Sequence, residues 1–273
     1  MLVFQRWYSD ETPGHRHLVV EGVIVALLGA TFAAWLFPDD ASLIAVFLAA
    51  VSNTDSIERL LDWNRREIQE RNRPPNTANL KLASLLLALF AGTTVGFSIL
   101  AMTLPIETVE ILFQNQVAEF GGQSFSTLEF GSAGGLLVHN LYVLLFFFAV
   151  AIPFRQGGIM LAVAWNASVW GSSFAILARV WSQAGGPGLV EAYLRVIGAC
   201  LPHMALEAAS YVLAGLAGVF LSKALLKYAL ESKRLESVIR SVALMLLFAA
   251  VLVVLGALWE GFIAPEVVRL LVR

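Results

Sequence analysis

Long apolar runs separated by polar segments are the feature of this sequence that most constrains its fold. Residues 18–37, 80–104, 136–153, 159–181, 199–222 and 241–263 are mostly apolar. Each is about twenty residues long, roughly what a helix needs to cross a ~30 Å hydrocarbon core. Residues 41–52 form a shorter apolar run. The pattern predicts an all-α, polytopic membrane protein with about seven transmembrane helices.

The composition agrees with a membrane location. Hydrophobic residues make up 58% of the chain and charged residues 14%, and the mean hydropathy is +0.75, values typical of polytopic membrane proteins. The net charge is −2 and the basic residues lie in clusters between apolar runs, so we expect a lipid bilayer and no nucleic acid as partner. The single cysteine, Cys200, excludes intramolecular disulfides and cysteine-based metal clusters.

Charge asymmetry between the apolar runs predicts an orientation. Residues 53–81 and 223–240 are two basic blocks, whereas residues 105–135 contain four glutamates and no lysine or arginine. Lysine and arginine are enriched in cytoplasmic loops. Four apolar runs separate the basic blocks, which therefore face the same side. With seven spans, this places the N-terminus in the cytoplasm and residues 105–135 outside the cell membrane; a re-entrant run at 41–52 would move the N-terminus outside.

The polar segments carry helical patterns of their own. Acidic and basic residues four apart predict that one long helix, half in lipid, covers 41–71 and ends at Pro74–Pro75. A short helix over 189–198 should lead into the next span. An amphipathic helix on the outer side is predicted by the apolar residues Ile106, Val109, Phe113, Val117 and Phe120. We expect two parts: an N-terminal hairpin with its helical extension (1–79) and a five-span core (80–273).

Two ionisable residues lie inside the apolar run 199–222. His203 and Glu207 are four residues apart and so share one helix face. A charge within the membrane is costly, which makes it a functional-site hypothesis by default. The same run contains small residues at four-residue spacing, which let a second helix approach closely in lipid. The expected packing residues are Ser210, Ala214, Gly215 and Gly218.

Other polar residues lie in neighbouring runs. His139 and Asn140 belong to the run 136–153, and Asn166 belongs to 159–181. The geometry allows a polar cluster between these helices and Glu207, and the candidate partners of the Glu207 carboxylate are His203, Arg179 and Arg195. Two interpretations stay open for this cluster: hydrogen bonds that fix helix packing, or a site that binds an ion or solute.

Sequence templates for catalysis are missing. The chain contains no His-Glu-x-x-His, no Gly-x-Ser-x-Gly and no phosphate-binding loop. His203 and Glu207 offer two metal ligands, fewer than the three or four of a zinc site. We therefore expect no enzyme activity, no metal and no cofactor.

Several short motifs occur in a recognisable order. They are Asn140-Leu-Tyr-Val, Gly157-Gly158, Asn166 to Gly171, Leu201-Pro202-His203 with Glu207, and Ala214 to Gly218. In order and spacing they resemble the stage II sporulation protein M family of integral membrane proteins, over residues 80–265. The sequence departs from the family pattern at Ala167 and Met204, which stand where glycines are usual.

The resemblance implies a membrane core without catalytic activity. The namesake of the family acts as a scaffold for peptidoglycan-degrading partners, but members also occur in organisms that do not sporulate. We therefore predict a non-enzymatic protein that anchors membrane or membrane-associated partners through residues 53–73 and 105–135, and that is compatible with homo-oligomers. The alternative is a permease or channel component that moves an ion, proton or small solute past Glu207 and His203.

Overall fold

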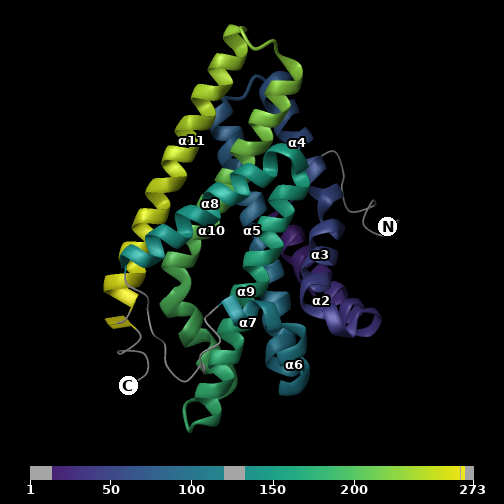
Figure 1. Cartoon of the computed structure of the whole chain (residues 1–273), viewed down its shortest axis with the longest axis vertical. Coiled ribbons are helices and arrows are strands. Elements are labelled where there is room, and N and C mark those ends of the chain that lie inside the picture. Colours follow the sequence, from purple (N-terminus) through teal and green to yellow (C-terminus); the bar gives the residue numbers. More distant parts are fainter. Residues whose placement is uncertain (1–13, 120–132, 265, 268–273) are drawn as a thin grey trace.

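The computed structural model describes residues 14–119, 133–264, 266 and 267. This part of the chain is mostly helical and contains no strand (Figure 1), which confirms the predicted all-α, polytopic class. Six helices are long and apolar enough to cross a membrane. They are α2 (His15–Leu36), α5 (Pro75–Thr103), α8 (Ala133–Phe154), α9 (Gln156–Gln183), α10 (Leu189–Lys227) and α11 (Lys233–Leu258).

The run 41–52, expected to be a seventh span, is not among these six. It forms α3 (Ala41–Ser52), whose 12 residues extend only about 18 Å at 1.5 Å per residue, less than the hydrocarbon core. The helix is interrupted at Asn53 and resumes as α4 (Thr54–Gln69). The single helix predicted over 41–71 is therefore two helices.

The helices run back and forth between two ends of an elongated bundle (Figure 1). The connections from α4 to α5 and from α10 to α11 lie at one end, which we call the basic end. Its exposed cations include Arg65, Arg66, Arg71, Arg73, Lys223, Lys227, Lys233 and Arg234. The opposite end holds α6 (Ile106–Leu112) and the turn between α9 and α10.

Glycines let α2 cross α5 at close range. A side-chain β-carbon on Gly92 would lie 2.1 Å from the Val19 carbonyl oxygen, and one on Gly22 would lie 2.5 Å from that of Leu89. Only glycine fits at such distances, because any larger residue would force the two backbones apart. The N-terminal helix is thereby packed directly on the first helix of the expected core.

The segment predicted as one amphipathic helix forms two short ones, α6 and α7 (Gln114–Glu119), which separate at Phe113. Val109 and Phe113 are buried, but Ile106 is exposed; Phe120 lies outside the described residues. Gln116 of α7 is also buried and accepts a hydrogen bond of 2.6 Å from the Ser42 hydroxyl of α3. The segment is thus anchored into the bundle by polar as well as apolar contacts.

The longest helix, α10, is continuous over 39 residues and includes Pro202. The separate helix predicted over 189–198 is therefore simply its first part. A proline is tolerated inside a transmembrane helix where neighbouring groups compensate the lost backbone hydrogen bond. At 1.5 Å per residue the helix is about 58 Å long, nearly twice the thickness of the hydrocarbon core.

The small residues of α10 face its neighbours. Ser210 and Ala214 are fully buried. A β-carbon on Gly218 would lie 2.5 Å from the Phe148 carbonyl oxygen of α8, and one on Gly215 would lie 3.0 Å from the Ile159 side chain of α9. This face of α10 therefore sits between α8 and α9 and permits their close approach.

We predict that Gly218→Leu destabilises the protein, because its side chain would overlap the α8 backbone. Overpacking of this kind costs about 1–3 kcal/mol, which should appear as a lower melting temperature in detergent. Gly198→Leu is the matched control, since a β-carbon on Gly198 of the same helix meets nothing within 4 Å. Equal melting temperatures for the two variants would show that Gly218 does not need to be small.

Candidate functional site

The candidate site lies where α8, α10 and α11 meet. Glu207 of α10 is 5% exposed. The side-chain amide of Asn140 on α8 donates a hydrogen bond to its carboxylate, and the Tyr211 hydroxyl donates to the Asn140 carbonyl oxygen at 3.1 Å. The Tyr211 ring is fixed by an edge-to-face contact with Phe147, with 5.6 Å between ring centroids. Glu207 is thus held by a polar network between two helices.

The last helix closes the site from a third side. A β-carbon on Gly256 of α11 would lie 3.4 Å from Cγ and 3.7 Å from Oε1 of Glu207. The absence of a side chain at this position lets the α11 backbone rest against the carboxyl group. Water has little room on this side of Glu207, because a helix surface takes its place.

A second carboxyl group near the site, Glu260, is not among the residues that the sequence pattern predicts. Glu260 lies in η2 (Trp259–Ile263), a π-helical turn that continues α11 and packs against α8 and α10. It stands four residues after Gly256, the residue whose backbone rests against Glu207. The sequence feature that could have indicated it is the presence of an acidic residue inside the final apolar run. Single π-helical turns are frequent at functional sites, and two carboxylates in apolar surroundings repel each other when both are ionised.

His203 lies one turn before Glu207 on α10 and is 6% exposed. Its Nδ1 atom has no hydrogen-bond partner among the residues that the structure describes. A buried nitrogen without a partner costs free energy, so this atom is available to a ligand or a proton. His203 therefore borders the Glu207 network and contributes a buried nitrogen that the described residues leave without a partner.

Two predicted members of the cluster are oriented elsewhere. Asn166 is buried, but its side-chain amide donates to the Ala162 carbonyl oxygen of its own helix at 2.9 Å. His139 is exposed, because one residue along a helix corresponds to a rotation of about 100° and Asn140 takes the inward direction. The cluster is thus formed by α8, α10 and α11, and the polar residue expected from α9 does not join it.

The two arginines considered as partners of Glu207 have other roles. Arg179 donates to the carbonyl oxygens of Ala101 and Leu104, at 2.9 and 2.7 Å, and so satisfies the last turn of α5. Arg195 forms an ion pair with Glu191 at 2.5 Å. Asn140, in contrast, was predicted only as a general member of the cluster, and the structure makes it the donor to Glu207.

A family model described as stage II sporulation protein M matches residues 23–265. The chain belongs to the stage II sporulation protein M family. The match begins well before residue 80, where the resemblance in the motifs starts, so the family relationship includes α3 and α4 as well as the core. No curated protein and no solved structure matches the chain.

The stage II sporulation protein M match covers all of the residues of the candidate site. Among the residues that the structure describes, no three His, Cys, Asp or Glu side chains are grouped closely enough to hold a metal ion. The chemistry of the site is therefore that of an amide, a phenol, an imidazole and two carboxyl groups. Such a set can fix helices by hydrogen bonds, or it can take up a proton or another small cation.

We predict that Asn140→Leu destabilises the protein more than Asn166→Leu does. The first change removes the donor to a buried carboxylate, which costs about 1–3 kcal/mol. The second removes a bond within one helix, and intramembrane hydrogen bonds contribute about 0.6 kcal/mol on average. Thermal unfolding in detergent measures the difference, and Glu207→Leu should restore part of the stability lost in Asn140→Leu. Similar losses in both single variants would contradict this role for Asn140.

Proposed function

We propose that this protein is a non-enzymatic integral membrane protein that anchors or organises partner proteins, with its N-terminus and its basic end in the cytoplasm. The N-terminus belongs on the side of the basic end because α2 and α5 run in parallel, with Val19 against Gly92 and Ala26 against Gly96. Although α3 alone is too short to cross, α3 and α4 together return the chain from the end of α2 to the start of α5.

The orientation is supported by the exposed arginines and lysines at one end of the bundle, because positive charge is enriched in cytoplasmic segments. Glu107 and Glu110 lie at the opposite end, on the side that faces away from the cytoplasm in this proposal.

The anchoring proposal rests on one observation: the Glu207 carboxyl group finds its hydrogen-bond partner within the protein. Its carboxylate accepts from Asn140, it is 5% exposed, and Gly256 of α11 lies against it. A polar group that finds its partner within the bundle stabilises one arrangement of three helices. This arrangement favours a rigid structural role for the charge over a place on a solute route.

A second candidate function is the movement of a proton or small cation. It is favoured by Glu260, a second carboxyl group in η2, which packs against α8 and α10, and by the unpartnered Nδ1 of His203. Chains of ionisable residues within a membrane often mark proton or ion pathways. The structural role tolerates the loss of the Glu207 charge, whereas movement of a proton or cation requires it. An isosteric substitution that removes this charge therefore distinguishes the two functions.

We predict that a single cysteine at Glu110 reacts with a membrane-impermeant maleimide in intact cells, whereas cysteines at Gln69 and Ser237 react only after permeabilisation. All three positions are exposed, and the buried Cys200 would first be replaced by alanine. The unsubstituted Cys200→Ala protein is the control for background labelling. Labelling of Gln69 or Ser237 in intact cells would overturn the proposed orientation.

We predict that Glu207→Gln retains the fold and the partner proteins that copurify with the wild type, because glutamine keeps the shape of the side chain and removes only its charge. Glu191→Gln, at an exposed position, is the matched control. Proton and sodium fluxes of both variants in proteoliposomes are compared with the wild type. A folded Glu207→Gln protein that loses a flux present in the wild type and in Glu191→Gln would establish the second function instead.

A further inference from the structure

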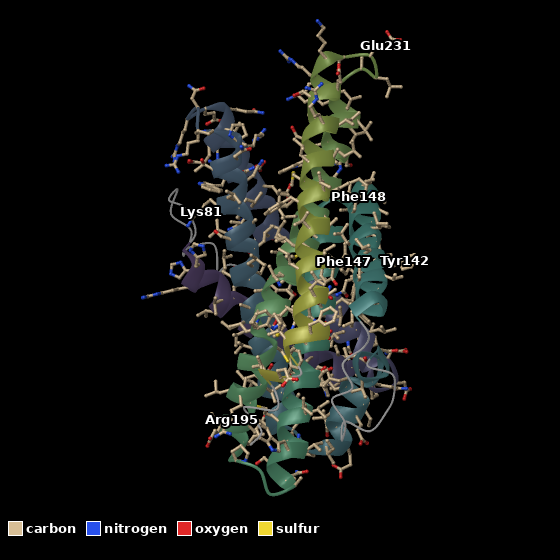
Figure 2. All side chains as sticks on the ribbon, turned by 90° about the vertical axis from the view of Figure 1, so that its left-hand side faces the viewer. Lys81, Tyr142, Phe147, Phe148, Arg195 and Glu231 are labelled. Carbon is tan, nitrogen blue, oxygen red and sulfur yellow. The ribbon has the colours of Figure 1, made fainter. Side chains whose placement is uncertain are left out.

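The end of the α10–α11 hairpin, residues 223–240, projects beyond the rest of the bundle, and we call it the hairpin tip. Gly218 packs against Phe148 and Ala151 of α8. The last residue of α8, Phe154, is therefore level with about residue 222 of α10. From there α10 continues for about another 8 Å at 1.5 Å per residue. In Figure 2, Glu231 of the tip accordingly lies well above Phe148 and Lys81.

The hairpin tip carries large apolar side chains that no other part of the described chain covers. Leu230 is 82% exposed and Leu226 is 70% exposed. Both lie among exposed cations, beyond the turn between α8 and α9, where we expect the polar side of the membrane boundary. Exposed leucines are ordinary where lipid covers them, but an apolar surface ringed by charges in water is typical of a protein interaction site.

The charge of the hairpin tip is positive and mostly uncompensated. It contains the cations Lys223, Lys227, Lys233, Arg234 and Arg240 and the anions Glu231 and Glu236. Arg240 is 3.5 Å from Glu236, whereas the other four cations form no ion pair with any residue that the structure describes. A surface with two leucines inside a cationic ring is complementary to an apolar surface inside an anionic one.

The cytoplasmic surface that the sequence suggested for partners, α4, exposes no such apolar centre in the part of the chain that the structure describes. In α4 the residues Ile57, Leu60, Leu61 and Trp63 are buried, and this helix packs on α5 and α9. Its exposed face carries charges of both signs, with Arg65 lying 3.5 Å from Asp62. The segments α6 and α7 likewise direct Val109, Phe113 and Gln116 into the bundle. Helix α4 has thus used its apolar face within the protein, whereas α6 keeps Ile106 and Ile111 exposed beside Glu107 and Glu110, at the end opposite the proposed cytoplasmic side.

We propose that the hairpin tip is the docking site for a cytoplasmic partner protein, and that it binds a helix presenting leucine-sized side chains between aspartates and glutamates. This inference rests on the proposed anchoring function and specifies where and what it anchors. An amphipathic helix is the fitting occupant, because its apolar stripe would cover Leu226 and Leu230 while its acidic flanks meet Lys227, Lys233 and Arg234.

The first test uses the full-length protein in its native membrane with a photo-crosslinking amino acid at Leu230, and in a parallel strain at Arg65 of α4. We expect a protein adduct at Leu230 whose crosslinked peptide, sequenced by mass spectrometry, is acidic and amphipathic. The adduct should disappear in the triple variant Lys227→Glu, Lys233→Glu, Arg234→Glu. It should persist in the matched control Arg65→Glu, Arg66→Glu, which reverses two exposed charges on α4.

The second test measures affinity with a defined probe. A fluorescent helical peptide of leucine and glutamate is titrated onto the purified protein in nanodiscs of zwitterionic lipid, with a leucine and lysine peptide of the same length as control. Binding of the acidic peptide should weaken about tenfold or more in the triple variant and with rising salt, as expected for charge-dominated recognition. Equal binding of both peptides, or no effect of the triple variant, would overturn the inference.

The outcomes separate this inference from the anchoring proposal. Partner adducts at Arg65 but not at Leu230 would leave anchoring intact and refute the hairpin tip as its site. Adducts of Leu230 with lipid alone would refute a protein partner at the tip. No protein adduct at either position would count against both proposals. Retained melting temperature of the triple variant shows that its losses do not come from unfolding.

Discussion

The constraint on which this structure depends is that a polar group in an apolar membrane must find its partner within the protein. Glu207 is the most demanding case, and its carboxylate is met by Asn140, which is in turn held by Tyr211. These bonds require α8 and α10 to lie in contact. Gly218 permits that contact and Gly256 lets α11 close over the carboxyl group. Three helices are therefore joined around one buried carboxyl group.

The same rule joins the remaining helices. The Ser98 hydroxyl of α5 donates to the Gly171 carbonyl oxygen of α9 at 3.0 Å, and the Tyr193 hydroxyl of α10 donates to Ser98 at 2.8 Å. At the end opposite the basic end, Gln116 bonds both Ser42 and Ser168, which ties α7 to α3 and α9. Because apolar side chains gain little from leaving lipid, such bonds and close packing supply most of the specificity between helices.

The sequence was sufficient for the features that depend on run length, charge and spacing, namely the six long spans, the basic end and the inward face of Ser210, Ala214 and Gly218. It was insufficient where the role of a residue depends on which part of another helix its side chain contacts. Asn166 satisfies its amide on its own helix, which a polar residue in a helix can always do. Glu260 stands at the end of an apolar run, where an acidic residue usually belongs to the interface. The α3 run was too short to classify by length alone.

The hairpin formed by α10 and α11 contains residues at its tip that membrane crossing does not require. Its second helix begins with an N-cap, in which the Ser232 hydroxyl accepts from the Leu235 amide at 3.2 Å. Ala224 and Leu235 are buried, so the two helices are held together at the tip by their own apolar contact. Leu226 and Leu230 take no part in that contact and point outward. The hairpin is capped and packed without these leucines, so they are free to form the apolar centre of the surface that we propose for the partner.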